Sequence, residues 1–170
     1  MLSFRALIAA RSIRPQFLMQ TVLLVLMHSV AGSTASTAEP TVLSGKAVAV
    51  SDGDTLRVLD ASGTQHVVRL RGIDAPETRQ AFGTKARQRL AELTMGKAAT
   101  VEIHDRDRFG RSVGVVEVAG ENVNERLVAD GMAWHYARFH KSPALAAAQR
   151  DAQAAKRGLW ADDYPVPPWS

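Results

Sequence analysis

Cysteine is absent from the 170 residues of this chain. Disulfide bonds and thiolate metal sites are therefore excluded, so stability must come from an apolar core and from any ion that the protein binds. The histidines do not supply a zinc site either, because His135 and His140 are five residues apart and neither matches a zinc-ligand spacing. We assign no catalytic role to these two histidines.

A long uninterrupted apolar run is also missing. The first 16 residues carry three arginines and no acidic residue, and residues 17–31 are apolar except for four polar side chains. Small residues follow. This order predicts a secretory signal peptide over residues 1–31, cleaved after Ala31, Ala35 or Ala38, and an exported protein, periplasmic or secreted. The run is too short and too polar to favour a membrane span, so an uncleaved anchor is only the alternative, and no membrane contact is expected after cleavage.

Net positive charge is small once this leader is removed. All 17 acidic residues follow residue 31, whereas three of the 21 lysines and arginines precede it, which leaves 18 basic residues and a charge of about +1. Any interaction with nucleic acid must therefore depend on local clusters of charge and not on bulk charge.

Composition divides the rest of the chain into three parts. Residues 32–40 are rich in serine, threonine and alanine, which predicts a flexible linker. Residues 41–161 carry the periodic patterns of one folded domain. The tail, residues 162–170, is too rich in proline for regular structure.

The domain pattern begins with three strands joined by tight turns. We expect them at residues 42–50, with an interruption near Gly45, at 55–59 and at 65–71. Further patterns predict a helix over 82–95, strands over 98–103 and 112–118, and helices over 123–129 and from Pro143 to Gly158. This order matches an α+β fold with a five-stranded Greek-key barrel of the oligonucleotide-binding (OB) type and three flanking helices.

Residues 67–78 combine basic and acidic side chains at the end of a strand. Arg69 and Arg71 share one strand face, and Asp74 and Glu77 follow next to Pro76, which forces a turn. Asp54 ends the first turn of the domain. If their strands are neighbours, Asp54 and Asp74 converge and provide oxygen ligands for a hard cation such as calcium. The alternative is that Asp52 and Asp54 only shape a turn.

Glu77 is a candidate general base for a water molecule, or it caps the following helix. Arg69 and Arg111 are candidates for binding phosphate, because guanidinium groups match phosphate oxygens. Sequence alone does not decide between Arg69 and Arg71. Charged residues around Arg106 and Arg108 resemble an exposed, self-neutralised turn.

Aromatic residues near residue 136 could stack on nucleic-acid bases. Tyr136, Phe139 and Trp134 are the candidates. We favour packing in the core for Trp134 and Phe139, which leaves Tyr136 as the base-stacking candidate.

Residues 42–160 resemble the staphylococcal nuclease-like (thermonuclease) family. The resemblance rests on an ordered series of motifs: Asp52-Gly-Asp-Thr55, Arg69 through Asp74-Ala-Pro-Glu-Thr78, Phe82-Gly83, Phe109-Gly-Arg111, Asn124 through Gly131-Met-Ala133, and Gly158-Leu-Trp160. It implies an OB-type barrel with three helices and a calcium-dependent nuclease that cleaves DNA and RNA to 3′-phosphate products.

The resemblance also implies roles for single residues. Asp54, Asp74 and the backbone carbonyl of Ala75 resemble the Ca²⁺ ligands, with Asp52 beside them and not bound to the ion. The matching catalytic residues are Arg69, Glu77 and Arg111. Arg108 and Tyr136 match nucleic-acid contacts.

Two hypotheses follow for the mature protein. The first is an exported, monomeric, calcium-dependent nuclease that favours single-stranded or unpaired DNA and RNA. The alternative is a catalytically inactive OB-fold module that binds nucleic acid or protein. That alternative predicts the loss of one or more of Asp54, Arg69, Asp74, Glu77 and Arg111, and none of them is lost.

Overall fold

The computed structural model describes residues 41–170. The predicted leader and linker, residues 1–40, lie outside the described residues. Within the described part of the chain, no helix is both long and apolar enough to cross a membrane.

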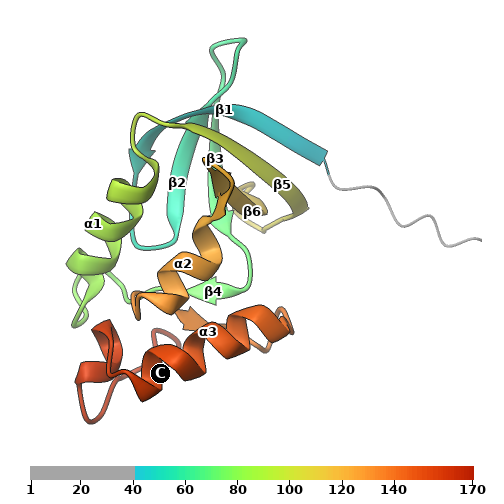
Figure 1. The fold of residues 1–170 in the computed structure, drawn as a ribbon. Helices are drawn as coiled ribbons and strands as arrows, with labels where there is room; N and C mark the ends of the chain where they lie inside the picture. Colours follow the sequence, from blue (N-terminus) through green and yellow to red (C-terminus); the bar gives the residue numbers. More distant parts are fainter. Residues whose placement is uncertain (1–40) are drawn as a thin grey trace, which may run out of the picture. The chain divides into compact units, whose positions relative to one another are not determined.

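Five strands close into a barrel (Figure 1). They are β1 (Thr41–Val50), β2 (Thr55–Leu59), β3 (Gln65–Leu70), β5 (Ala98–Arg106) and β6 (Ser112–Val118). Their order is β3-β2-β1-β5-β6, and a parallel pairing of β3 with β6 joins the two ends. Together with three α-helices, this closed barrel confirms the predicted α+β fold of the OB type.

β1 is continuous through Gly45, so the predicted interruption there is wrong. Gly45 pairs with Ala99 of β5. A Cβ atom at Gly45 would lie only 2.4 Å from the carbonyl oxygen of Leu59. The glycine is therefore needed for the close approach of β2, and the irregularity in β1 lies instead between Ala47 and Ala49.

β5 extends three residues beyond its predicted end at Ile103. Asp105 pairs with Val113 and Arg106 with Ser112, after a register shift next to Ile103. The apolar alternation stops at Ile103 because the following side chains are mostly exposed at the end of the barrel. The backbone ladder continues without them.

Three helices accompany the barrel: α1 (Gly83–Thr94) and α2 (Val123–Ala129) pack on it, and α3 (Pro143–Ala154) packs on α2. Figure 1 shows α2 between the barrel and α3, and α2 contacts α1, β6 and α3. Ser142 caps the N-terminus of α3, because its hydroxyl accepts a hydrogen bond from the Leu145 amide at 3.2 Å. A short 3-10 helix, η1 (Gly158–Ala161), follows α3.

The core fills the space between the barrel and the helices. Its largest fully buried side chains include Leu56, Leu70, Ile73, Leu90 and Leu127. Apolar surface removed from water by these residues is the main term that stabilises the fold.

Asn124 is a buried polar residue at the start of α2. Its Oδ1 accepts a hydrogen bond from the Val116 amide at 3.0 Å, and its Nδ2 donates to the Arg71 carbonyl at 2.9 Å. These bonds connect α2 to β6 and to the end of β3. Asn124 therefore holds together the segments that enter the candidate site.

Three very short strands were not predicted: β4 (Ile73–Asp74), β7 (Glu121–Asn122) and β8 (Trp134–His135). β7 pairs with β6, and β4 pairs with β8, with Asp74 opposite Trp134. The β4–β8 pairing places the acidic end of residues 67–78 beside the aromatic segment that contains Tyr136.

The two aromatic residues assigned to the core behave differently. Trp134 packs against Trp160 with ring centroids 4.3 Å apart, which confirms its packing role. Phe139 is 71% exposed, so its assignment to the core is wrong. Phe139 lies in a turn beyond the end of β8, where no element covers its ring.

Candidate active site

The turn between β1 and β2 places Asp54 at the mouth of the barrel. A Cβ atom at Gly53 would lie 2.6 Å from the Cβ of Ala75 and 2.7 Å from that of Ala86, so only glycine permits this close approach. The turn is thereby packed against both the segment after β4 and α1. Asp54 is buried, and its Oδ2 accepts a hydrogen bond from the Ala75 amide at 2.8 Å.

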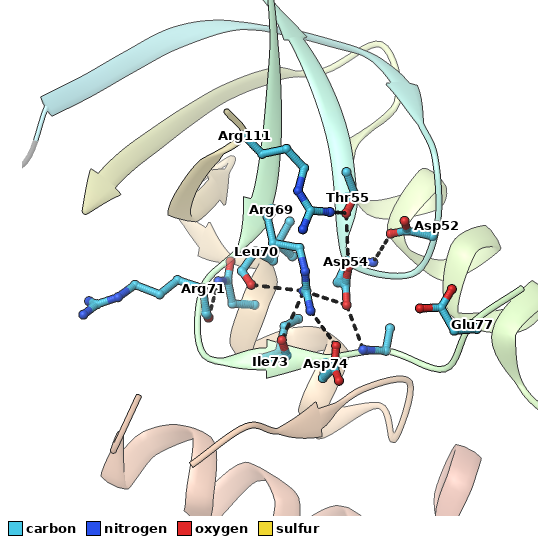
Figure 2. Close-up of polar contacts among 12 residues, drawn as sticks. Asp52, Asp54, Thr55, Arg69, Leu70, Arg71, Ile73, Asp74, Glu77 and Arg111 are labelled. Carbon is cyan, nitrogen blue, oxygen red and sulfur yellow. Dashed lines mark hydrogen bonds and ion pairs between the residues drawn. The ribbon is translucent and has the colours of Figure 1, made fainter. Parts of the chain in front are cut away.

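Arg69 joins the two aspartates that the sequence predicts to converge (Figure 2). Its Nη1 lies 2.6 Å from Oδ2 of Asp54, and its Nη2 lies 2.5 Å from Oδ1 of Asp74. Nη1 also donates to the Ile73 carbonyl at 3.1 Å. Asp54 and Asp74 therefore do converge, and one guanidinium holds them.

Burial raises the pKa of Asp54 to about 7, against the opposing effect of the Arg69 charge. The nearby charge of Asp52 raises this pKa further. Burial also raises the pKa of Asp74, which Arg69 again opposes and Glu77 reinforces. Both carboxyl groups are therefore harder to ionise than exposed ones, and a nearby positive charge favours their ionised forms.

Asp52 and Asp54 differ in what their side chains do. Asp52 accepts a hydrogen bond from the Asp54 amide at 3.1 Å, so the turn-shaping alternative describes Asp52. The carboxylate of Asp54 instead binds Arg69 and the Ala75 amide. For Asp54 the turn-shaping alternative is wrong.

Glu77 follows β4 and is exposed. Figure 2 shows its side chain on the same side of the site as Asp52, directed toward Asp54. α1 begins later, with Phe82 as its N-cap and no side-chain cap, so the alternative that Glu77 caps this helix is wrong. Among the described residues, no side chain forms a hydrogen bond or ion pair with the Glu77 carboxylate.

Arg111 reaches the site from the loop between β5 and β6. Oδ2 of Asp107 binds the Nε of Arg111 at 2.6 Å, and this bond keeps the pKa of Asp107 low despite partial burial. Nη1 of Arg111 lies 3.4 Å from the hydroxyl of Thr55, which in turn donates to Asp54 at 3.2 Å. Arg69 and Arg111 therefore belong to one polar network.

The sequence of this chain matches a known protein family. A family described as "Staphylococcal nuclease homologue" matches residues 67–162, which is more than half of the chain and includes Arg69, Asp74, Glu77 and Arg111. The chain belongs to the staphylococcal nuclease family.

Individual relatives agree with this family membership. An "Uncharacterized endonuclease" of Escherichia coli is 43% identical over 126 residues, which cover 74% of this chain and 82% of that protein. A "Probable staphylococcal-like nuclease CAN1" of Oryza sativa subsp. japonica is 37% identical over 125 residues, which cover 71% of this chain. The match spans only 38% of the rice protein, and only 32% of a 42% identical "Uncharacterized 38.1 kDa protein" of Capnoides sempervirens.

Two other predicted positions lie away from this polar network. Arg71 points away from Asp54 in Figure 2, so Arg69 is the arginine of this strand that joins the carboxylates. Arg108 is exposed, and its guanidinium lies 4.8 Å from the ring centroid of Phe109. The structure does not bring Arg108 into the network of Asp54 and Arg69.

Sequence reasoning missed the connecting role of Thr55. Thr55 is buried, and its hydroxyl contacts both the neighbouring Asp54 and Arg111, which is 56 positions away in sequence. Its place in the motif Asp52-Gly-Asp-Thr55, directly after a predicted ligand, was the signal that could have identified it.

Tyr136 lies beside the arginines. A cavity of about 440 Å³ is lined by residues that include Arg69, Arg71, Asp105, Arg111, Tyr136 and Phe139. The backbone amide of Tyr136 donates to the Gly72 carbonyl at 2.8 Å, which fixes this segment against the end of β3. Basic, acidic and aromatic side chains thus line one cavity.

The donor set at the site suits a hard cation. Two carboxylates converge, and oxygen ligands are what such ions prefer. In the described part of the chain, no group of three or more histidine, cysteine or acidic side chains is arranged to hold a metal ion. Any metal here would therefore complete its coordination with backbone oxygen, water or substrate.

Proposed function

We propose that this protein is a calcium-dependent nuclease that hydrolyses phosphodiester bonds of DNA and RNA. Membership of the staphylococcal nuclease family supports the nuclease part of this proposal. The proposal goes further than family membership in four respects: calcium dependence, exported localisation, a monomeric state and 3′-phosphate products.

One observation carries the proposal: Arg69 contacts both Asp54 and Asp74, and Thr55 connects Asp54 to Arg111. Two carboxylates and two guanidinium groups thus belong to one connected polar network, and Figure 2 shows the Glu77 side chain directed toward it. Such a set can bind a phosphodiester and stabilise the negative charge that grows on its oxygens during attack.

Each residue has a distinct role in this mechanism. Asp54, Asp74 and the Ala75 carbonyl would hold calcium, which when bound would polarise the phosphate and add positive charge. Arg69 and Arg111 would bind the non-bridging phosphate oxygens. Because Arg69 is paired with both aspartates, it would have to exchange at least one carboxylate for phosphate.

The exposed carboxylate of Glu77 would accept the proton of the attacking water. A bond then forms between the water oxygen and phosphorus, and the bond from phosphorus to the 5′ oxygen breaks. The leaving 5′ oxygen takes up a proton. The products are one strand with a 3′-phosphate and one with a 5′-hydroxyl.

A plasmid and single-stranded oligonucleotide assay tests the function. Wild-type protein should cleave with calcium and fail in chelator, and Glu77→Gln should be about 100-fold slower. Glu117→Gln, at an exposed glutamate of β6, is the matched control and should retain full activity. Salt-sensitive binding without cleavage under any divalent ion would instead favour the inactive binding module.

Product analysis and localisation test the finer parts. A 5′-end-labelled oligonucleotide should yield fragments that carry a 3′-phosphate. Treatment with a 3′-phosphatase should therefore change the gel mobility of these fragments. For export, the protein recovered from the periplasm or medium should begin after Ala31, Ala35 or Ala38. A 3′-hydroxyl product, or a protein retained at full length in the cytoplasm, would contradict these parts.

A further inference from the structure

The C-terminal tail carries an aromatic contact that the predicted site does not include. Trp169 stacks on Tyr136 with ring centroids 4.7 Å apart and ring planes 11° from parallel. Trp169 lies beyond residue 162, where the match to the family ends. A tail without regular structure therefore contacts a ring that lines the cavity beside Arg69 and Arg111.

Contacts with the domain hold Trp169 in this position. Its ring also meets Trp134 edge to face, with centroids 5.8 Å apart, and Trp134 packs in the same manner on the buried Trp160. By contrast, Tyr164 of the same tail is 86% exposed. Trp169 is thus the tail residue that the aromatic cluster holds.

Tyr136 is constrained from several directions. Trp169 covers one face of its ring, Phe139 lies 4.7 Å away at a tilt of 53°, and the Tyr136 amide is bonded to the Gly72 carbonyl. Tyr136 and Phe139 line the cavity, whereas Trp169 does not. Trp169 therefore supports the Tyr136 ring from outside the cavity.

Phe139 offers the free aromatic surface of this group. Phe139 is 71% exposed although it borders a cavity lined by three arginines. Exposed aromatic rings beside basic side chains are the arrangement that binds unpaired bases, because every base has a face that can stack. A paired base has both faces covered within the duplex and cannot use such a ring.

We propose that Trp169 is a positioning residue for a base-binding subsite: it fixes the ring of Tyr136 at the edge of the arginine cavity, where Tyr136 and Phe139 bind an unpaired base of the substrate. This inference rests on the proposed nuclease function, and it assigns the tail a part in the preference for single-stranded nucleic acid. Without Trp169 the Tyr136 ring can rotate, and the cavity loses its fixed aromatic wall.

The test compares two probes in the full chain. One is dye-labelled tetrathymidylate, and the other is the same tetranucleotide backbone with abasic spacers at all four positions. Binding is measured by fluorescence anisotropy with calcium in a Glu77→Gln background. Trp169→Leu should lower the affinity for tetrathymidylate about five- to tenfold, but that for the abasic probe less than twofold.

Two further variants separate positioning from general stability. Trp169→Phe, which keeps a ring, should bind tetrathymidylate within about twofold of the protein with Trp169. Tyr164→Leu should bind both probes as tightly as the protein with an unmodified tail. With Glu77 intact, Trp169→Leu should raise KM for single-stranded DNA with little change in kcat. If Trp169→Leu lowers the melting temperature strongly, Trp169→Met replaces it.

Equal losses for both probes, no loss for Trp169→Leu, or failure of Trp169→Phe to restore affinity would overturn the proposal. These outcomes are distinct from a failure of the proposed function. A protein that binds tetrathymidylate in this Trp169-dependent manner but never cleaves would refute the nuclease mechanism alone. A protein that cleaves normally with Trp169→Leu at unchanged KM would refute the subsite alone.

Discussion

Arg69 and Asp54 form an ion pair of 2.6 Å at the mouth of the barrel, with side chains that are only 18% and 8% exposed. The two residues are 15 positions apart in sequence: Arg69 lies on β3, and Asp54 directly precedes Thr55, the β2 residue that pairs with Arg69. Because Arg69 also binds Asp74, one guanidinium neutralises part of the charge on both predicted metal ligands. In the proposed mechanism, binding of a metal ion by these aspartates and binding of phosphate by Arg69 would therefore be coupled.

Replacing Arg69 should strengthen the stabilising effect of calcium. In Arg69→Met, Asp54 and Asp74 lose their shared counter-charge, so the protein should melt at a lower temperature than wild type in chelator at pH 8. Saturating calcium should then raise its melting temperature by more than it raises that of wild type, since the ion replaces the guanidinium. A smaller calcium-induced rise in Arg69→Met would contradict the idea that calcium and the Arg69 guanidinium occupy the same place beside the two aspartates. Arg87→Met, at an exposed arginine of α1, is the control.

Metal affinity should depend on pH through Asp54. Its pKa in the folded protein is about 7, and the ion binds the ionised carboxylate. Affinity should therefore rise with pH up to about 7 and level off above it, falling about tenfold per pH unit on the acidic side because one proton is released. Calorimetric titration with calcium between about pH 5 and pH 8 measures this slope. A pH-independent affinity would refute the assignment of Asp54 as a ligand.

Asp54→Asn should lose metal binding and yet gain stability at alkaline pH. A raised folded pKa means that the folded protein keeps a proton which the unfolded chain releases near pH 3.8, so stability is lost as pH rises through about 7. The neutral amide removes this cost. In chelator at pH 8 its melting temperature should exceed that of wild type by about 3 °C or more, with a smaller difference at pH 5. Melting curves by circular dichroism decide this, and a lower melting temperature at pH 8 would contradict it.

Glu77→Gln should reduce kcat about 100-fold and leave folding and calcium affinity unchanged. The reason is that Glu77 is exposed and its carboxylate has no side-chain partner within the described residues. Steady-state kinetics, calorimetry and a melting curve on the same preparation measure the three quantities. A weakened calcium affinity equal to the loss in rate would identify Glu77 as a metal ligand instead.

Asn124→Ala should lower the free energy of unfolding by about 2 to 3 kcal/mol, because it leaves the buried Val116 amide and Arg71 carbonyl without their partner. Asn122→Ala is the matched control, since it removes the cap of α2 and should cost about 1 kcal/mol. Urea denaturation measures both. Equal losses would show that Asn124 acts only locally in α2.

Sequence patterns alone are sufficient to predict the barrel strands, the three helices and the family. Local signals are strong at these positions, as with Ser142 and Pro143 at the start of α3 or the glycine-rich turns between strands. The motif order also predicts Asp54, Arg69, Asp74, Glu77 and Arg111 as site residues. These properties depend on residues close together in the chain, where periodicity and turn chemistry act.

Only the tertiary structure decided how these residues meet. Arg69 and Arg71 are two residues apart, so the sequence predicts both on the same face of the strand and does not distinguish them. In the closed barrel, Arg69 is the one that contacts the two aspartates. The link from Arg111 through Thr55, the exposure of Phe139 and the contact of Trp169 with Tyr136 depend on segments that are distant in the chain. No local pattern records such contacts, because packing of the whole domain brings their partners together.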